Sequence, residues 1–246
     1  MYQITKARRK KVFIVRVNKK EKAMDRKNWL KKRNKGIGGS DASAIIGANP
    51  YKSNVELWLE KTGRKQPEDI SNKDFVKYGI NAEESLRNLF ALDYPEFKVE
   101  YKKFDMFYHP NYPFLFGSLD GRLKHLETGL KGIYEGKTTN ILSSQHKEKW
   151  ADDNIPQNYY VQILHYMLVT GFDFAVINAQ LKFIYPDNNT KITDFVLPDR
   201  QIKTIRKIFW RKDCLDDINY LLEQEVKFWQ EYVEKDIEPP LVLPRI

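Results

Sequence analysis

The stretch that decides the fold reads GIYEGKTT and covers residues 132–139. It follows the turn-like LETG of residues 126–129, and it alternates well enough to predict a short strand. Side chains two positions apart share one face of a strand, so Glu135 and Lys137 are expected to project together. An acid and a base on one face of a strand can form a catalytic pair.

A second run, FLFGSLDG at residues 114–121, comes just before this strand. Its Asp-Gly pair and polar residues predict an antiparallel neighbour, which would bring Asp120 near Glu135. Magnesium prefers oxygen ligands and binds through a few carboxylates together with substrate phosphates. Beside such a metal, Lys137 can orient or deprotonate an attacking water. The alternative is an exposed strand that carries an ordinary cross-strand ion pair.

The composition predicts one large domain, and it also bears on the cellular location of the protein. With 246 residues, 41% of them hydrophobic and 13% aromatic, the chain can bury a sizeable core. We predict a basic arm at residues 1–22 and a single domain at residues 23–246. Neither a membrane-spanning run nor a secretory signal is expected, and the single cysteine, Cys214, fits a reducing cytoplasm. Iron–sulfur and zinc-hydrolase sites are not expected, because thiolates are too few and the histidines lack metal-binding spacing.

The positive charge lies at the front of the chain. Residues 1–35 hold fifteen Lys or Arg against two acids, a net of +13, which leaves 27 basic and 31 acidic residues, a net of −4, for the rest. A basic arm beside a nearly neutral body is typical of a nucleic-acid binder. The other interpretation is a solubilising tail.

A glycine-rich loop follows a short basic helix predicted at residues 23–32. Ser40 or Asp41 can cap a second helix that ends at Gly47. Backbone N–H groups at such a loop favour anions, so Arg33 and the Ser40 hydroxyl can hold a phosphate. The alternative is a glycine turn between two helices. Neither this loop nor the Gly-Lys-Thr of residues 136–138 matches a nucleotide-binding P-loop.

Two further helices are predicted at residues 54–62 and 73–92. In the second helix Glu83 falls on the apolar stripe. A carboxylate there is costly to bury unless it is paired or binds a metal, which makes Glu83 a candidate third ligand.

The second half of the chain adds strands and helices to one mixed sheet. Strands are predicted at residues 97–108, 114–123, 174–184 and 191–197. A helix at residues 156–170 carries Gln162 in its apolar middle, either as a core hydrogen-bonding group or as an active-site group. A long amphipathic helix is predicted at residues 199–235, with a break near residues 212–213. The fold class is therefore mixed α/β (α+β), with about five strands, flanking helices and a long C-terminal helix.

Several motifs occur in the order seen in YqaJ-type viral recombinases, which are similar to the phage lambda alkaline exonuclease. The matching residues are Trp29, Arg33, Gly39, Ser40, Asp41, Gly79, Glu83, Ser118, Asp120, Gly121, Glu135, Lys137 and Gln162. The resemblance covers roughly residues 25–235. It implies a restriction-endonuclease-like fold of the PD-(D/E)XK superfamily.

The resemblance also implies a metal site. Asp120 and Glu135 would bind Mg²⁺ or Mn²⁺, Lys137 would activate water, and Glu83 would ligate a second ion. The backbone carbonyl of Gly136 would complete the ligands. Family members more often have an apolar residue at this position, but only its carbonyl is expected to matter.

By the same resemblance, Gln162 matches the helix glutamine of the family, and Arg33, Ser40 and Ser118 match its 5′-phosphate pocket. These residues imply a 5′-to-3′ exonuclease on double-stranded DNA that leaves 3′ overhangs for recombination. A phage single-strand annealing protein as partner, a homotrimer, and the cytoplasm of a bacterial host are expected. Two alternatives are a restriction or repair endonuclease of the same fold and a non-catalytic DNA-binding relative.

Overall fold

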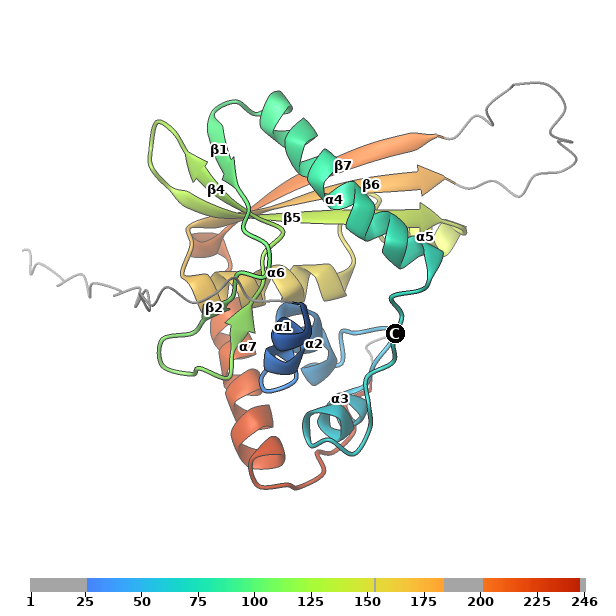
Figure 1. Ribbon diagram of the computed structural model, residues 1–246, viewed down its shortest axis with the longest axis vertical. Helices are drawn as coiled ribbons and strands as arrows, with labels where there is room; N and C mark the ends of the chain where they lie inside the picture. Colours follow the sequence, from blue (N-terminus) through green and yellow to red (C-terminus); the bar gives the residue numbers. More distant parts are fainter. Residues whose placement is uncertain (1–25, 153, 184–200, 244–246) are drawn as a thin grey trace, which may run out of the picture.

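The structure is a computed structural model that describes residues 26–152, 154–183 and 201–243 (Figure 1). The arm predicted for residues 1–22 and the strand predicted for residues 191–197 lie outside these ranges. In the described ranges, no helix has both the length and the apolar character needed to cross a membrane.

Five strands form the central sheet, in the spatial order β1-β4-β5-β6-β7. Their bounds are β1 (Phe97–Glu100), β4 (Gly121–His125), β5 (Lys131–Ile141), β6 (Phe174–Phe183) and β7 (Ile202–Trp210). β5 and β6 run parallel, whereas the other neighbouring pairs run antiparallel. A small separate sheet pairs β2 (Phe107–Tyr108) with β3 (Phe116–Gly117). The predicted mixed sheet is confirmed.

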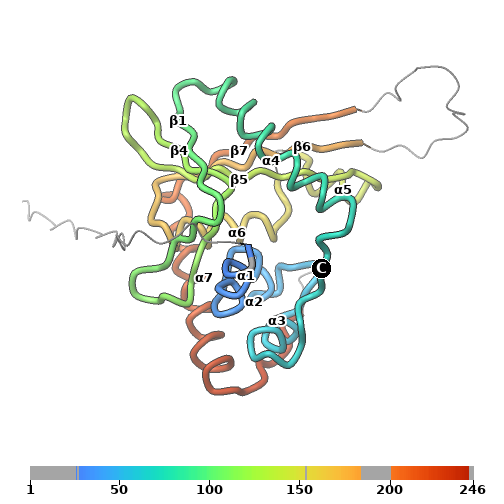
Figure 2. The backbone as a smooth tube through the Cα atoms, in the orientation of Figure 1, coloured from blue at the N-terminus to red at the C-terminus, as the bar shows by residue number. Residues whose placement is uncertain are grey.

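Helices cover both faces of the sheet (Figures 1 and 2). Their bounds are α1 (Arg26–Arg33), α2 (Gly39–Ile45), α3 (Asn54–Lys61), α4 (Asp74–Asp93), α5 (Ser144–Glu148), α6 (Gln157–Thr170) and α7 (Leu215–Lys227). α4 crosses one face, and α6 lies on the other, with α2 and α7 packed against it. α6 is also the crossover that two parallel strands require. It begins after Pro156 and ends at Gly171, whose φ of 65° is the left-handed C-terminal conformation that glycine favours.

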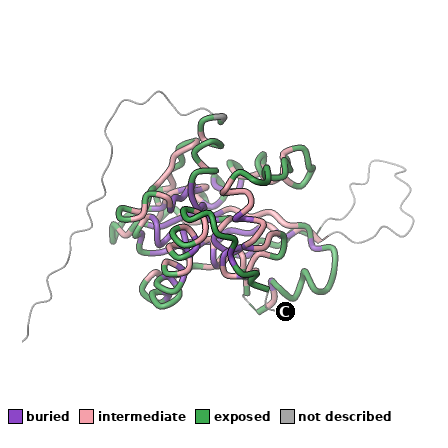
Figure 3. The backbone as a smooth tube through the Cα atoms, turned by 90° about the horizontal axis from the view of Figure 1, so that it is seen from below, coloured by how far each residue is buried: buried purple, intermediate pink, exposed green. Residues whose placement is uncertain are grey.

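Alternation along β5 divides the interior into two cores. Ile133 belongs to the larger core on the α6 side, whereas Tyr134 belongs to a smaller core with Phe90 of α4 and Phe174. Figure 3 shows the buried stretches running through the centre of the molecule, with exposed segments around them. Because Glu135 shares the Ile133 face of the strand, it is directed toward α6.

The apolar stripe predicted along α4 is only partly buried. Leu86, Arg87 and Phe90 are the buried residues of this helix, while Phe75 and Ile80 are 59% and 55% exposed. Leu89 and Leu92, near the C-terminal end of the helix, are also exposed, at 52% and 77%, so the stripe is uncovered at both ends.

The helix predicted at residues 199–235 is wrong over its first part. Residues 202–210 form β7, which pairs antiparallel with β6 along nearly its whole length. Apolar residues spaced by three resemble a helical stripe, but β-branched residues and pairing with β6 favour a strand here. A 3₁₀ turn, η1 (Arg211–Asp213), stands at the predicted break, and α7 then continues into a π-helix, η2 (Phe228–Val233).

Candidate active site

The antiparallel pair β4–β5 brings Asp120 to Glu135. Gly121 pairs with Tyr134, so Asp120 lies beside the next residues of β5. The Gly136 N–H donates to the Asp120 Oδ2 carboxylate oxygen at 3.0 Å. The structure therefore brings the two carboxylates together where β4 begins, beside the middle of β5, as the sequence predicts.

Glu135 and Lys137 project together from β5. The Lys137 Nζ ammonium lies 2.6 Å from Glu135 Oε1, and the side chains are 17% and 3% exposed. The Lys137 ammonium also lies 4.8 Å from the ring centroid of Tyr159 on α6. This pair is therefore a buried one, and the exposed cross-strand ion pair considered from sequence is wrong.

Gln162 joins this pair from α6. Its Oε1 accepts from Lys137 Nζ at 3.0 Å, and its Nε2 donates to Glu135 Oε1 at 2.7 Å and to the Tyr166 hydroxyl at 2.9 Å. Of the two roles considered from sequence, this geometry favours the active-site group over the core residue.

Burial and mutual repulsion raise the pKa values of the carboxyl groups. Burial and the Asp120 carboxylate raise the pKa of Glu135 to about 8, against the effect of Lys137. Burial also raises the pKa of Asp120, although Lys137 and the Gly136 N–H oppose it. Burial alone would lower the pKa of Lys137, but Glu135 and Asp120 hold it above its ordinary value. Lys137 is thus an ammonium that can orient a water but cannot accept a proton in this state.

Glu83 reaches the same group of charges from α4. Burial and Asp120 raise the pKa of Glu83 to about 7, and Glu83 in turn contributes to the raised pKa of Glu135. Three carboxyl groups therefore repel one another around a single lysine. Strongly perturbed carboxyl groups are typical of functional sites.

The donor set fits a hard divalent cation. Glu135 Oε2 is buried and has no hydrogen-bond partner in the part of the chain that is described. A bound cation would give this oxygen a partner and relieve the repulsion between the carboxylates. In the described ranges no three His, Cys, Asp or Glu side chains form a ready-made metal cluster, so waters and substrate phosphates would have to supply ligands. The Gly136 carbonyl as a ligand stays a prediction.

The predicted phosphate pocket is brought together in part. Arg33, at the end of α1, donates from Nη2 to Ser40 Oγ at 3.5 Å, and its guanidinium lies 4.5 Å from the ring centroid of Trp29. The Ser118 hydroxyl instead donates to the carbonyl of Asp105 at 3.2 Å. No described contact joins Ser118 to Arg33 or Ser40.

The helix after the glycine loop begins earlier than predicted. Gly38 is its N-cap, and Asp41, three residues later, accepts from the Gly38 N–H at 3.0 Å. The Lys61 ammonium of α3 lies 2.7 Å from the same Asp41 oxygen. Burial would raise the pKa of Asp41, but Lys61 and the Gly38 N–H hold it below its ordinary value. Asp41 is therefore a charged residue that holds the glycine loop in place, and it is not the N-cap of α2.

Sequence reasoning missed Arg87 and Tyr166. Arg87 is 8% exposed, donates from Nη1 to the Asp120 carbonyl at 2.7 Å, and stacks 3.9 Å from the ring centroid of Tyr101. Arg87 stands four residues after Glu83 on α4, and Tyr166 stands four residues after Gln162 on α6. That spacing was the available signal.

His165 packs in the interior, as predicted. Its side chain is fully buried, with Nδ1 2.7 Å from Glu225 Oε1 and Nε2 2.8 Å from the Phe116 carbonyl. It ties α6 to α7 and to β3, and it has no contact with the solvent.

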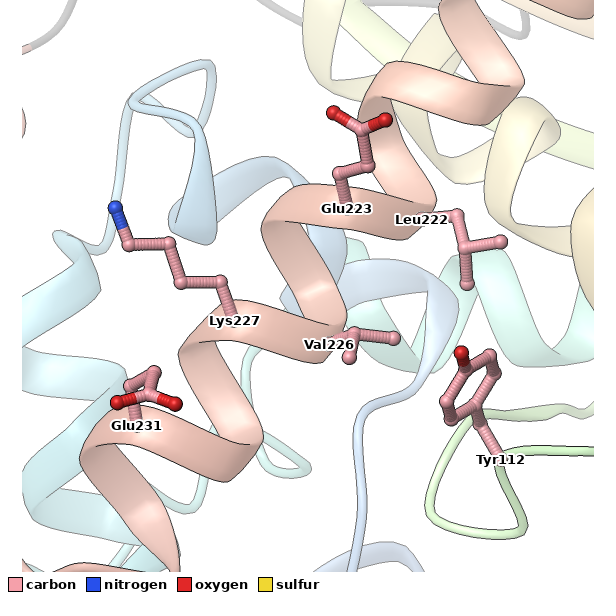
Figure 4. Close-up of a pocket in the computed structure, with 6 residues that line it drawn as sticks. All are labelled: Tyr112, Leu222, Glu223, Val226, Lys227 and Glu231. Carbon is pink, nitrogen blue, oxygen red and sulfur yellow. The ribbon is translucent and has the colours of Figure 1, made fainter.

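A surface hollow of about 350 Å³ lies against α7 (Figure 4). Its lining residues are Tyr112, Leu222, Glu223, Val226, Lys227 and Glu231. None of these is a candidate site residue, so this hollow is separate from the charged cluster around Glu135. We place the chemistry at the cluster, because three carboxyl groups with raised pKa values, Asp120, Glu135 and Glu83, meet Lys137 there.

Comparisons with known proteins find a matching family model and a relative. The model of the YqaJ-like viral recombinase domain matches residues 28–173. The protein YqaJ of Bacillus subtilis (strain 168) is 33% identical over 221 residues, which cover 87% of this chain and 58% of the relative. The chain thus spans little more than half the length of that relative.

Two solved structures share the fold. An alkaline exonuclease, LHK-Exo, from Laribacter hongkongensis matches with a TM-score of 0.53 at 15% identity, over 85% of this chain and 97% of that one. A phage related exonuclease from Haemophilus somnus 129PT matches with a TM-score of 0.50 at 16% identity, over 82% and 96%. At these identities the likeness establishes the fold alone.

Proposed function

The chain belongs to the family of YqaJ-like viral recombinase domains, and from that premise we propose that it is a metal-dependent exonuclease. It would degrade one strand of double-stranded DNA from a 5′ end and leave a 3′ single-stranded overhang for recombination by strand annealing. The similarity of its fold to two structures described as exonucleases supports this proposal.

One observation carries the proposal. Glu135 Oε1 accepts from both Lys137 and Gln162, while Glu135 Oε2 is buried without a partner among the described residues. An unpaired buried carboxylate oxygen is costly. Glu225 Oε2, beside His165, is also unpaired in the described part of the chain, but Glu135 differs from it because the carboxyl groups of Asp120 and Glu83 act on the same site. An oxygen left for a bound cation fits a hydrolytic site.

The proposed cofactor is a pair of divalent ions, either Mg²⁺ or Mn²⁺. Asp120, Glu135 and the Gly136 carbonyl would hold one ion, and Glu83 would contribute to the second. When bound, such ions stabilise negative charge on the phosphate and on the leaving oxygen.

The protein's own groups would then position the reactants. Arg33 and Ser40 would hold the terminal 5′-phosphate, which fixes the scissile phosphodiester at the site. The Lys137 ammonium and the Gln162 carbonyl oxygen would orient the attacking water. Because Lys137 is held as an ammonium, its part is orientation and charge stabilisation before any proton transfer.

The partners follow from the family and stay proposals. A phage single-strand annealing protein would receive the 3′ overhang, and a homotrimer would surround the duplex. The single domain at residues 23–246 and the basic arm at residues 1–22 are likewise proposed. A DNA substrate and a single cysteine fit the cytoplasm of a bacterial host.

An endonuclease is the second candidate function, and one observation favours it. Ser118 donates to the Asp105 carbonyl, which leaves Arg33 and Ser40 as the joined pair of the proposed end pocket. An endonuclease needs no end pocket and would cut a closed circle.

The test uses a linear duplex with one 5′-phosphorylated end and one 5′-hydroxyl end, each strand labelled separately. Degradation is followed with Mg²⁺ or with EDTA, beside closed circular plasmid and the Asp120→Asn variant. Metal-dependent loss of the 5′-phosphorylated strand with the circle intact is the expected result. Cutting of the circle would establish the endonuclease instead, and metal-independent binding without cleavage would establish a non-catalytic DNA-binding relative.

A further inference from the structure

Tyr166 lies between the start of α2 and Gln162. Its side chain is 6% exposed. A Cβ atom placed on Gly39 would lie 2.6 Å from Tyr166 Cε1, and one placed on Gly117 would lie 3.2 Å from Tyr166 Cδ1. The first turn of α2, which carries Ser40, therefore rests directly on the tyrosine ring, a contact that requires glycine at residue 39.

The hydroxyl of the same ring contacts the catalytic cluster. Gln162 Nε2 donates one hydrogen to Glu135 Oε1 at 2.7 Å and the other to the Tyr166 hydroxyl at 2.9 Å. Both hydrogens of the amide nitrogen are thus used, which leaves the amide oxygen for Lys137 at 3.0 Å. Tyr166 therefore helps to set the orientation of the amide that meets Lys137.

We propose that Tyr166 is a positioning residue that couples the occupied end pocket to the catalytic cluster, an inference that rests on the proposed exonuclease function. A phosphate held by Arg33 and Ser40 fixes the first turn of α2, and that turn fixes the ring. The hydroxyl then holds Gln162 in line with Lys137 and Glu135. A 5′-phosphorylated end is thereby cleaved faster, as well as bound more tightly, than a 5′-hydroxyl end.

A purely structural role for Tyr166 would give a different result with the two substrates. If Tyr166 only filled space, removing its hydroxyl would leave the ring packing intact and change both substrates alike. Coupling predicts that the kcat advantage of the 5′-phosphorylated end shrinks, while KM for that end changes little.

The experiment compares Tyr166→Phe with the unchanged protein on duplexes that differ only in the 5′ group. Tyr160→Phe is the matched control. It also removes a tyrosine hydroxyl from α6, but that hydroxyl donates to Asp217 of α7. The ratio of kcat on the phosphorylated end to kcat on the hydroxyl end should fall about tenfold in Tyr166→Phe, the size of one lost hydrogen bond. Tyr160→Phe should keep the ratio of the unchanged protein.

A second variant changes the same contact from the side of α2. Gly39→Ala places a methyl group against the ring, and it should lower the same ratio while thermal unfolding shows a folded protein. An unchanged ratio in Tyr166→Phe and Gly39→Ala would overturn the coupling and leave the exonuclease function in place. If the unchanged protein showed no preference for the phosphorylated end, the end pocket itself would fail, and the coupling would fail with it.

Discussion

At Glu135, one carboxylate oxygen accepts from Lys137 and Gln162, and the other is buried without a partner among the described residues. The position of this residue could be predicted, because strand alternation alone places it beside Lys137. The direction of the Ser118 hydroxyl could not be predicted, because it depends on where the loop carrying Asp105 comes to lie. A single residue is predictable when local geometry decides its neighbours.

Lys137→Ala should reduce the rate of DNA cleavage at least about 100-fold, because it removes the ammonium that would orient water beside Glu135. DNA binding should remain, since phosphate contacts elsewhere are unchanged. Lys65→Ala, which breaks an exposed pair with Glu56 on α3, is the control and should cleave normally. Single-turnover cleavage and a binding titration measure the two effects. Full cleavage by Lys137→Ala would remove this lysine from the mechanism.

Two glycines of β5 should respond differently to one added methyl group. A Cβ atom on Gly132 would lie 2.2 Å from the buried Phe174 ring, whereas one on Gly136 would meet Tyr134 and Asp120 at ordinary contact distances from 3.5 Å. Gly132→Ala should therefore lower the free energy of unfolding by about 1–3 kcal/mol. Gly136→Ala should change it little. Urea unfolding of both variants measures this, and equal losses would contradict the steric argument.

At the scale of elements, the helices with clear ends were predictable and β7 was not. Pro156 and Gly171 mark both ends of α6. Ile202, Ile205 and Ile208 are spaced as on a helix, and only the partner strand β6 makes this segment extended. The secondary structure of such a segment depends on tertiary pairing, which local sequence does not contain.

His165 joins three elements, and its contribution to stability should depend on pH. Burial would lower the pKa of His165, but Glu225 on α7, the Phe116 carbonyl and the nearby Asp41 charge together raise it. Its contribution is therefore complete below the ordinary value of 6.5 and is lost as pH rises through the raised value. His165→Gln should lower the free energy of unfolding by about 3 kcal/mol at pH 6, with a smaller loss at high pH.

The matched control for this experiment is His146→Gln, whose side chain is exposed on α5. Urea unfolding at several pH values should show that His146→Gln follows the unchanged protein. A loss in His165→Gln that is the same at every pH would mean that the pair is not ionised in the folded state.

At the scale of the whole molecule, the sheet with helices on both faces was predictable from the order of strands and helices. The sequence could not show which face α4 covers, or that Phe75 and Ile80 would be exposed. Both facts depend on where α4 crosses the sheet, which is decided by packing against β5 and β1.

Deleting residues 1–22 should weaken DNA binding and make it less sensitive to salt. This segment holds nine Lys or Arg and one acid, a net of +8, so the remaining chain keeps a net of only +1. Each lost phosphate contact should reduce the slope of log K against log salt by about 0.9. Binding titrations at several salt concentrations measure the slope, with cleavage at saturating DNA as the control. An unchanged slope would show that the segment is a solubilising tail.

The order of strands in the sheet has a consequence for self-association. β7 is an outermost strand, and in the described ranges no strand lies beyond it. Such an edge exposes unpaired backbone groups that can template pairing with another molecule. Lys203 is an exposed side chain of β7, whereas Arg206 on the same strand is paired with Asp93 of α4. Like charges at Lys203 on two such edges would repel each other. We therefore expect Lys203 to oppose edge-to-edge pairing when the protein is concentrated.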